Sequence, residues 1–192
     1  MAIVTNLDVW MPFLIAGGVV ALWLGDFRVR AFVITAGLLL AVNDGLVSKT
    51  LKRIIDRPRP HQSHNDVRIV ELAKAKPRVL AVAKPLKIKR SESELGDVNG
   101  RSFPSSHAMN TLAVALAGVT FFGRKAWWLF IIAALVGYSR IYTGAHWPSD
   151  ILVSLFLGAG VSLPLLALVN PVWHKIAPRC FPQLHAQHPN VL

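Results

Sequence analysis

The stretch ILVSLFLGAGVSLPLLALV, residues 151–169, carries no charged side chain. A helix that crosses a lipid bilayer needs about 20 mostly apolar residues, and about 17 is the practical minimum. The stretch therefore has the length and composition of a membrane-spanning helix, with a kink expected at Pro164. A single span would only anchor a protein, so the number of similar runs decides the fold.

Similar apolar runs occur earlier in the chain, at residues 9–25, 31–48, 108–122 and 126–138. Asn43 and Asp44 interrupt the second of these runs, and the third is short enough to need residues from its ends. Together the five runs predict an all-α fold, a polytopic bundle of about five transmembrane helices, with residues 1–192 forming one integral membrane domain.

Composition agrees with this prediction. The chain of 192 residues is 53% hydrophobic, yet it carries 21 Lys and Arg against 10 Asp and Glu, a net charge of +11. A nucleic-acid-binding module would spread such charge among polar residues, so no nucleic-acid partner is expected. Long apolar runs joined by basic loops are typical of membrane proteins. The single cysteine, Cys180, cannot form an internal disulfide.

A polar stretch, residues 59–102, separates the second apolar run from the third. Its basic residues include Lys74, Lys76, Arg78, Lys84, Lys87, Lys89 and Arg90. Pro77 and Pro85 exclude one long helix, so short helices lying on the membrane surface are expected. A solvated loop is the alternative. The proline-spaced end of the chain, residues 170–192, is expected to be a short exposed tail.

Clusters of polar residues lie at the edges of the apolar runs. The first, KRIIDRPRP at residues 52–60, follows the second run and places Lys52 and Arg59 beside the membrane. Basic residues in such a place can simply anchor the chain to lipid headgroups. Taken alone, this cluster indicates nothing more than anchoring.

The second cluster, GRSFPSSH at residues 100–107, directly precedes the third run. Ser105 or Ser106 is expected as the helix N-cap. The free amides of a first helical turn bind anions, and nearby hydroxyl groups strengthen such a site. Taken alone, the cluster is explained better by ordinary helix capping, with His107 as an interfacial side chain.

The third cluster, SRIYTGAHWPSD at residues 139–150, joins the fourth run to the fifth. Pro148 suits the first turn of the last helix, which places Asp150 inside that helix and His146 just before it. A carboxylate four residues after a histidine can accept the ring N–H and fix the tautomer. Such a pair is more often structural than catalytic, but Arg140 lies in the same connection.

The order of the spans brings the three clusters together. The second and fourth spans end, and the third and fifth begin, on the same face of the membrane. Lys52, Arg59 and Arg140 would then surround serines and the two histidines, His107 and His146. Cations, hydroxyl groups and histidines at one place are the groups that phosphoryl transfer uses.

The three clusters resemble the signature of the type 2 phosphatidic acid phosphatase superfamily, which includes membrane lipid phosphatases, soluble bacterial acid phosphatases and vanadium haloperoxidases. That signature reads K-x6-R-P, then P-S-G-H, then S-R-x5-H-x3-D. The matching residues are Lys52, Arg59, Pro60, Pro104, Ser105, His107, Ser139, Arg140, His146 and Asp150. Ser106 replaces the glycine of the second motif, and a residue this small still lets its amide approach a phosphate.

The resemblance implies a metal-independent phosphatase that acts on a lipid phosphomonoester or diphosphate, such as undecaprenyl diphosphate, phosphatidylglycerol phosphate, phosphatidate or lipid A phosphate. It implies that His146 is the nucleophile, forming a phosphohistidine, that Asp150 supports it, and that His107 is the general acid. The residues implied to bind the phosphate are Lys52, Arg59, Ser105, Ser106 and Arg140. No cofactor and no metal are expected, and the expected partners are the substrate and membrane lipids.

Several questions stay open at the level of the sequence. Most Lys and Arg residues fall on the face of the site, which the positive-inside rule would make cytoplasmic. The resemblance instead implies the outer face of the bacterial inner membrane. A non-catalytic protein that binds anionic lipids, or a haloperoxidase-like enzyme, is the alternative function. Asn43 and Asp44 are polar residues within a span, for which a structural role is expected. No oligomeric state is indicated.

Overall fold

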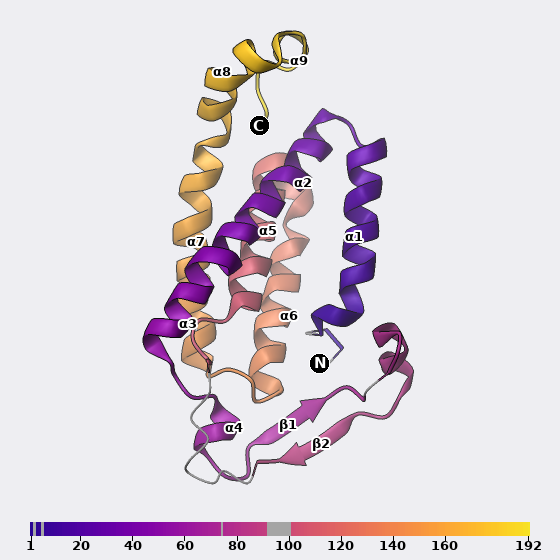
Figure 1. Ribbon diagram of the computed structural model, residues 1–192, viewed down its shortest axis with the longest axis vertical. Helices are drawn as coiled ribbons and strands as arrows, with labels where there is room; N and C mark the ends of the chain where they lie inside the picture. Colours follow the sequence, from indigo (N-terminus) through magenta and orange to yellow (C-terminus); the bar gives the residue numbers. More distant parts are fainter. Residues whose placement is uncertain (2, 5, 74, 92–100) are drawn as a thin grey trace.

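The computed structural model describes residues 1–192 except residues 2, 5, 74 and 92–100. Within the polar stretch, Lys74 and residues 92–100 therefore lie outside the described residues. The long helices stand side by side as a bundle (Figure 1), and they are α1 (Leu7–Leu24), α2 (Phe27–Leu40), α5 (Ser106–Phe122), α6 (Trp128–Tyr142) and α7 (Pro148–Ala167).

Two of these helices continue into further helical segments. Helix α2 runs through the π-helical segment η1 (Ala41–Ser48) into α3 (Lys49–Ile55), and α8 (Val169–Cys180) follows α7. Three helical stretches are long and apolar enough to cross a membrane, namely Leu7–Leu24, Phe27–Ser63 and Pro148–Cys180. Helix α6 is a shorter apolar helix. The predicted all-α membrane bundle is thus confirmed. Pro164 does not end α7, which continues to Ala167.

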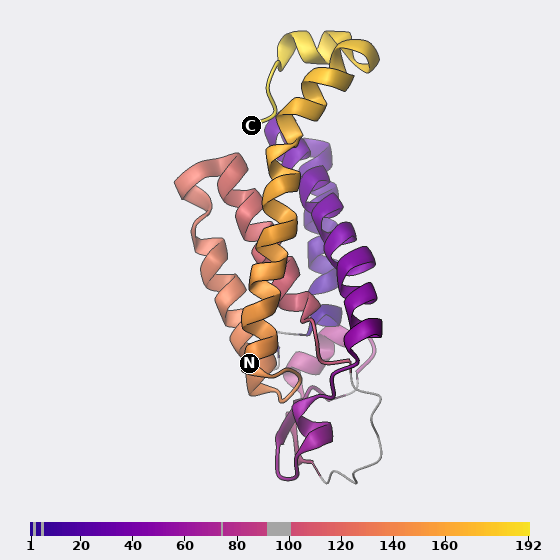
Figure 2. The same cartoon turned by 90° about the vertical axis from the view of Figure 1, so that its left-hand side faces the viewer.

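Helix α5 forms the centre of the bundle, with α2, α6 and α7 packed around it (Figure 2). Its fully buried positions are mostly small, and they include Ala108, Ala113, Ala115 and Ala117. Small side chains let helix backbones approach closely. Gly158 of α7 makes one such close approach, because a Cβ there would lie 3.0 Å from the Cα of Met109.

The outward surface of the bundle is apolar. Leu14 is 62% exposed, Trp23 78% and Phe156 76%. A soluble protein rarely exposes so many large apolar side chains, whereas lipid chains cover them without cost. Within the span that contains it, Asn43 is fully buried and donates from Nδ2 to Ser162 Oγ at 3.3 Å, which supports the structural role expected for Asn43.

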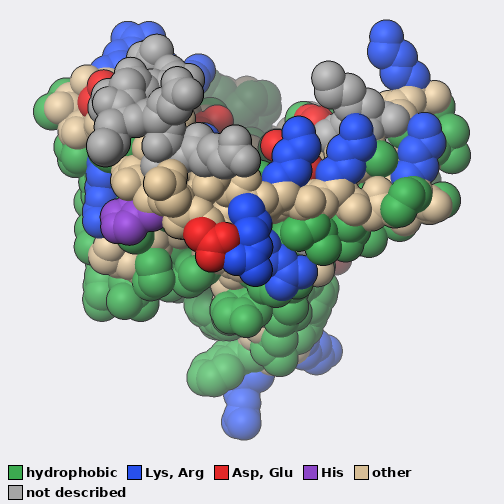
Figure 3. Space-filling view, turned by 90° about the horizontal axis from the view of Figure 1, so that it is seen from below, with side chains coloured by type: hydrophobic (Ala, Val, Ile, Leu, Met, Phe, Trp, Pro, Cys, Tyr) green, Lys and Arg blue, Asp and Glu red, His purple; other side chains and the backbone are tan. Residues whose placement is uncertain are grey.

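The polar stretch 59–102 contains the expected short helices, α4 (Pro60–Ser63) and η2 (Arg78–Ala83). It also contains an antiparallel hairpin of β1 (Arg68–Glu71) and β2 (Lys87–Arg90), which the sequence prediction did not include. The hairpin forms here because Leu86, Lys87, Ile88 and Lys89 alternate between apolar and basic side chains, and such a two-residue period suits a strand. Lys and Arg side chains line this hairpin (Figure 3).

The end of the chain is mostly exposed, as expected for a tail, but it is folded. After α8, helix α9 (Pro182–Gln187) turns the chain back toward the bundle. Asn170 Oδ1 accepts the backbone N–H of Val191 at 2.9 Å, and Val191 is buried in the main apolar core. A polar cap at the start of α8 therefore holds the last residues of the chain in place.

Replacing Gly158 by leucine should destabilise the protein. The added side chain would have to push α5 away from α7, and overpacking of this kind costs about 1–3 kcal/mol. Gly160→Leu is the matched control, because a Cβ at Gly160 meets nothing within 4 Å. Unfolding temperatures in detergent check this, and equal temperatures for the two variants would contradict the close approach.

Candidate active site

The three polar clusters meet at one end of the bundle. Lys52, in α3, donates from Nζ to Ser106 Oγ at 2.7 Å, which joins the first cluster to the second. Arg57 Nη1 lies 2.6 Å from Asp150 Oδ1, which joins the first cluster to the third. These contacts confirm that the clusters share one face.

His146 lies in the connection between α6 and α7 and is only 4% exposed. Its Nδ1 is 2.5 Å from the carbonyl oxygen of Ser102. A carbonyl oxygen only accepts hydrogen bonds, so Nδ1 carries the proton and the lone pair is on Nε2. Burial, together with the positive charges of Arg140 and Arg59, lowers the pKa of His146 to about 3. The imidazole is therefore neutral near pH 7.

The loop that holds His146 is closed by its own backbone. The carbonyl of Arg140 accepts the N–H groups of Ala145 at 3.1 Å and of His146 at 3.3 Å. Gly144 has φ +69° in this turn, and a Cβ there would lie 2.6 Å from the carbonyl oxygen of Arg68. Only glycine combines this backbone conformation with such a close neighbour. The loop is therefore fixed in two ways: its own hydrogen bonds hold the backbone of His146, and Gly144 contacts β1.

Asp150 is connected to His146 differently from the expected way. Among the hydrogen bonds of the described residues, none joins Asp150 to His146 directly. The fully buried carboxylate instead accepts from Ser102 Oγ at 2.5 Å and from the N–H of Trp147 at 3.2 Å, besides Arg57. Asp150 is the third residue of α7, so its side chain reaches back to cap that helix. Ser102 bridges the two residues, because its hydroxyl binds Asp150 and its carbonyl binds His146.

Arg57 and Ser102 belong to the candidate site, although the sequence analysis did not single them out. The guanidinium of Arg57 lies 5.6 Å from the ring centroid of Trp147, and its Nη1 also donates to Ser149 Oγ at 3.2 Å. In the sequence, Arg57 cannot be distinguished from the other cations of the first cluster. Ser102 acts partly through its backbone carbonyl, which leaves no signal in a residue pattern.

The serines expected to bind phosphate begin α5. Ser105 is the N-cap and is fully buried; its N–H donates to Ser154 Oγ at 2.8 Å, and its own Oγ has no hydrogen-bond partner within the described part of the chain. Ser106 Oγ lies 2.7 Å from Ser48 Oγ as well as from Lys52 Nζ. The serine that replaces the family's glycine thus orients Lys52. His107 follows in the first turn of the helix.

One set of cations acts on both histidines. Lys52, Arg59 and Arg140 each interact electrostatically with His107 and with His146, and Arg140 has the largest such effect on either ring. Asp44 also acts on Lys52 and His107. An anion between the two rings would be attracted by all three cations.

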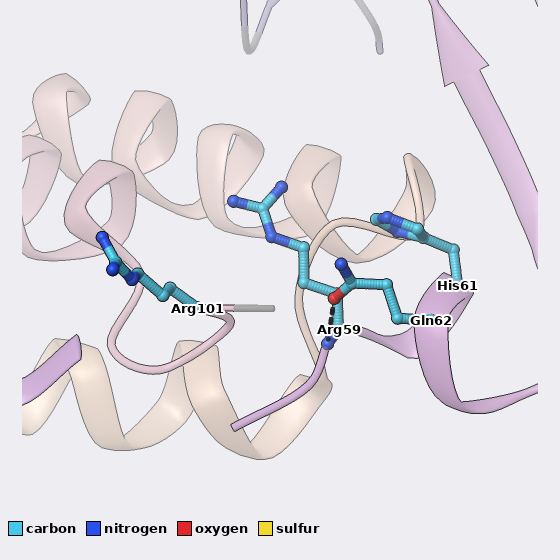
Figure 4. Close-up of a pocket in the computed structure, with 4 residues that line it drawn as sticks. All are labelled: Arg59, His61, Gln62 and Arg101. Atoms are coloured by element: carbon cyan, nitrogen blue, oxygen red, sulfur yellow. Dashed lines mark hydrogen bonds between the residues drawn. The ribbon is translucent and has the colours of Figure 1, made fainter. Parts of the chain in front are cut away.

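A polar cavity of about 360 Å³ adjoins Arg59 (Figure 4). Its lining residues are Arg59, His61, Gln62 and Arg101, and Arg59 is held by its N–H bond to Gln62 Oε1 at 3.0 Å. Arg101 was not among the predicted site residues, and it adds a positive charge to the lining of the cavity and acts electrostatically on Lys52. Outside residues 2, 5, 74 and 92–100, no three His, Cys, Asp or Glu side chains are grouped to bind a metal ion.

Fold and site together define a class: helical membrane proteins with a cationic, histidine-containing site for anions at one end of the bundle. The model of the PAP2 superfamily matches residues 29–173, and the chain belongs to that superfamily. No solved structure gives a significant match.

Similar proteins of assigned function include two kinds of phosphatase. An undecaprenyl-diphosphatase of Sulfolobus acidocaldarius is 40% identical over 65 residues, 32% of this chain and 30% of the relative. Undecaprenyl-diphosphatase BcrC of Bacillus subtilis is 47% identical over 55 residues, 28% of each chain. A lipid A 1-phosphatase of Rhizobium johnstonii is 31% identical over 144 residues, 73% of this chain and 50% of the relative. The matches thus span half or less of each of these relatives.

Arg57→Met should destabilise the protein because it leaves the buried carboxylate of Asp150 without its cation. Removing one partner of a fully buried pair costs about 3–5 kcal/mol, and because Arg57 is 39% exposed a cost at or below about 3 kcal/mol is expected. In an Asp150→Asn background the same substitution should cost much less, since no charge is left unpaired. Chemical unfolding in detergent measures all four proteins, with exposed Arg53→Met as the control. Equal costs in both backgrounds would contradict the role of the pair.

Proposed function

We propose that this chain is a membrane phosphatase that hydrolyses a phosphomonoester or diphosphate of a lipid through a phosphohistidine intermediate, without a metal ion. The neutral His146 ring, with its lone pair on Nε2 and three cations acting on it, is the observation that carries the proposal. A neutral imidazole is a nucleophile toward phosphorus, and preorganised cations stabilise the charge of the transferring group.

The reaction has two steps. In the first, Nε2 of His146 forms a bond to phosphorus as the bond to the leaving oxygen breaks, and His107 gives that oxygen a proton. In the second, water attacks phosphorus, His107 takes the proton of the water, and the N–P bond breaks to return the lone pair to Nε2. Lys52, Arg59 and Arg140 hold the phosphate oxygens, and Ser105 Oγ adds a hydrogen bond.

The bridge through Ser102 has a role in the first step. Phosphorylation of Nε2 makes the ring cationic, and the Nδ1–H bond to the Ser102 carbonyl then becomes stronger, because its donor is charged. Asp150 holds Ser102 by its hydroxyl and is therefore a positioning residue. It acts on the nucleophile through Ser102 instead of touching it.

The substrate class is a lipid phosphate presented at the end of the bundle. Two of the relatives carry the name undecaprenyl-diphosphatase and another is a lipid A 1-phosphatase, so long-chain diphosphates and lipid A phosphates are the substrates to test first.

The proposal includes the outer face of a bacterial inner membrane as the location of the site. A Ser63→Cys, Cys180→Ser variant should react with a membrane-impermeant maleimide in intact cells. Failure of the cysteine at position 63 to react would contradict the outer location of the site.

His146→Ala should lower phosphate release from the best lipid substrate by at least about 1,000-fold, and His107→Ala by about 100-fold to 10,000-fold. Exposed His174 of α8 provides the control variant His174→Ala, which should keep wild-type activity. Vanadate should inhibit the wild type, and activity should survive EDTA.

The decisive measurement is phosphate release in detergent from a panel of lipid phosphates and diphosphates. Wild-type rates for folded His146→Ala would disprove the nucleophile, and loss of activity in EDTA that magnesium restores would disprove the metal-free mechanism.

A further inference from the structure

Strand β2 and the residue before it have one apolar and one basic face. Leu86 and Ile88 alternate with Lys87 and Lys89, so the two pairs project to opposite sides of the strand. Ile88 is paired with Val70, and paired residues project to the same side of a sheet. Val70 is 5% exposed and packs in a cluster with Val9 of α1. The apolar side of β2 therefore continues a layer that is buried against the start of a membrane-spanning helix.

On the apolar side of β2, Leu86 and Ile88 are 47% and 55% exposed, and in η2, which precedes β2 in the chain, Leu80 and Val82 are 55% and 43% exposed. Segment η2, which carries Leu80 and Val82, packs against α1. The exposed patch thus lies where the apolar outer surface of the bundle ends, which is the level at which lipid chains meet headgroups in a bilayer.

The charges on the hairpin are mainly positive. Arg90 is paired with Asp66, and the Arg68 guanidinium lies 4.9 Å from the ring centroid of Tyr142. Lys87 stands opposite Glu71, whereas Lys89 stands opposite the apolar Ile69. Cations beside an inserted apolar patch match the anionic phosphates of a lipid surface.

We propose that the hairpin surface, formed by Leu80, Val82, Leu86 and Ile88 with Lys87 and Lys89, docks on the anionic headgroup layer of the surrounding bilayer. The four apolar side chains enter the interface, and the lysines contact lipid phosphates from the water side by extending over the strand. The occupant is the lipid surface itself, not a single bound lipid molecule.

Docking would also hold the loop of His146. The carbonyl of Arg68, at the start of β1, contacts Gly144 so closely that a Cβ there would be 2.6 Å away. His61 Nδ1 and the Gly144 carbonyl oxygen are 2.9 Å apart, which ties α4 to the same turn. A hairpin fixed on lipid therefore limits the movement of the turn that carries His146.

The test places a fluorescent label on each side of the hairpin. Ile88→Cys and Glu71→Cys, each with Cys180→Ser, are labelled with an environment-sensitive dye and reconstituted in phosphatidylcholine vesicles with or without about 30% phosphatidylglycerol. Nitroxide lipids should quench the label at 88 and not the label at 71. Quenching at 88 should be about twofold stronger in the anionic vesicles.

Charge variants complete the test. Lys87→Gln with Lys89→Gln should remove the dependence on phosphatidylglycerol, whereas Arg124→Gln with Lys125→Gln, which removes two exposed cations at the opposite end of the bundle, should keep it. Equal quenching at 88 and 71 would overturn the proposal, as would the same dependence on phosphatidylglycerol in both double variants. Because the readout requires no catalysis, it is independent of the proposed phosphatase activity.

Discussion

The carboxylate of Asp150 is fully buried, and the arrangement of the candidate site depends on how its charge is compensated. A buried anion without partners costs several kcal/mol, so it persists only when donors surround it. Here the donors come from three separate parts of the chain: Arg57, the Ser102 hydroxyl and the Trp147 amide. Because all three donors must reach the same carboxylate, the chain segments that carry them are held in a single relative position.

The site also contains a repulsion that its ligand would relieve. Lys52, Arg59 and Arg140 repel one another electrostatically, and like charges held near one another destabilise a protein. A bound phosphate would convert this repulsion into attraction. Residues that are rigidly held without ligand need little reorganisation when charge develops in a reaction.

Much of this architecture could be predicted from the sequence, because the bilayer imposes a simple length rule on apolar runs. The position of the N-cap at Ser105 and the start of α7 at Pro148 could be predicted, although the Ser105 hydroxyl makes no capping hydrogen bond. The partner of Asp150 could not be predicted, since a carboxylate four residues after His146 satisfies the histidine pattern whether or not the two touch. The hairpin was missed for another reason: its strands are short, and prolines between them indicate only that a long helix is absent.

The π-helical segment η1 has a geometric effect on everything that follows it. A π-helical turn takes up about one residue more than an α-helical turn. Each extra residue rotates the later side chains by roughly 100° about the helix axis relative to an uninterrupted α-helix. Segment η1 ends at Ser48, immediately before the helix that carries Lys52. The widened turns thus determine the direction in which Lys52 projects from the helix axis. A membrane helix of the same length without them would direct that charge to a different side of the bundle.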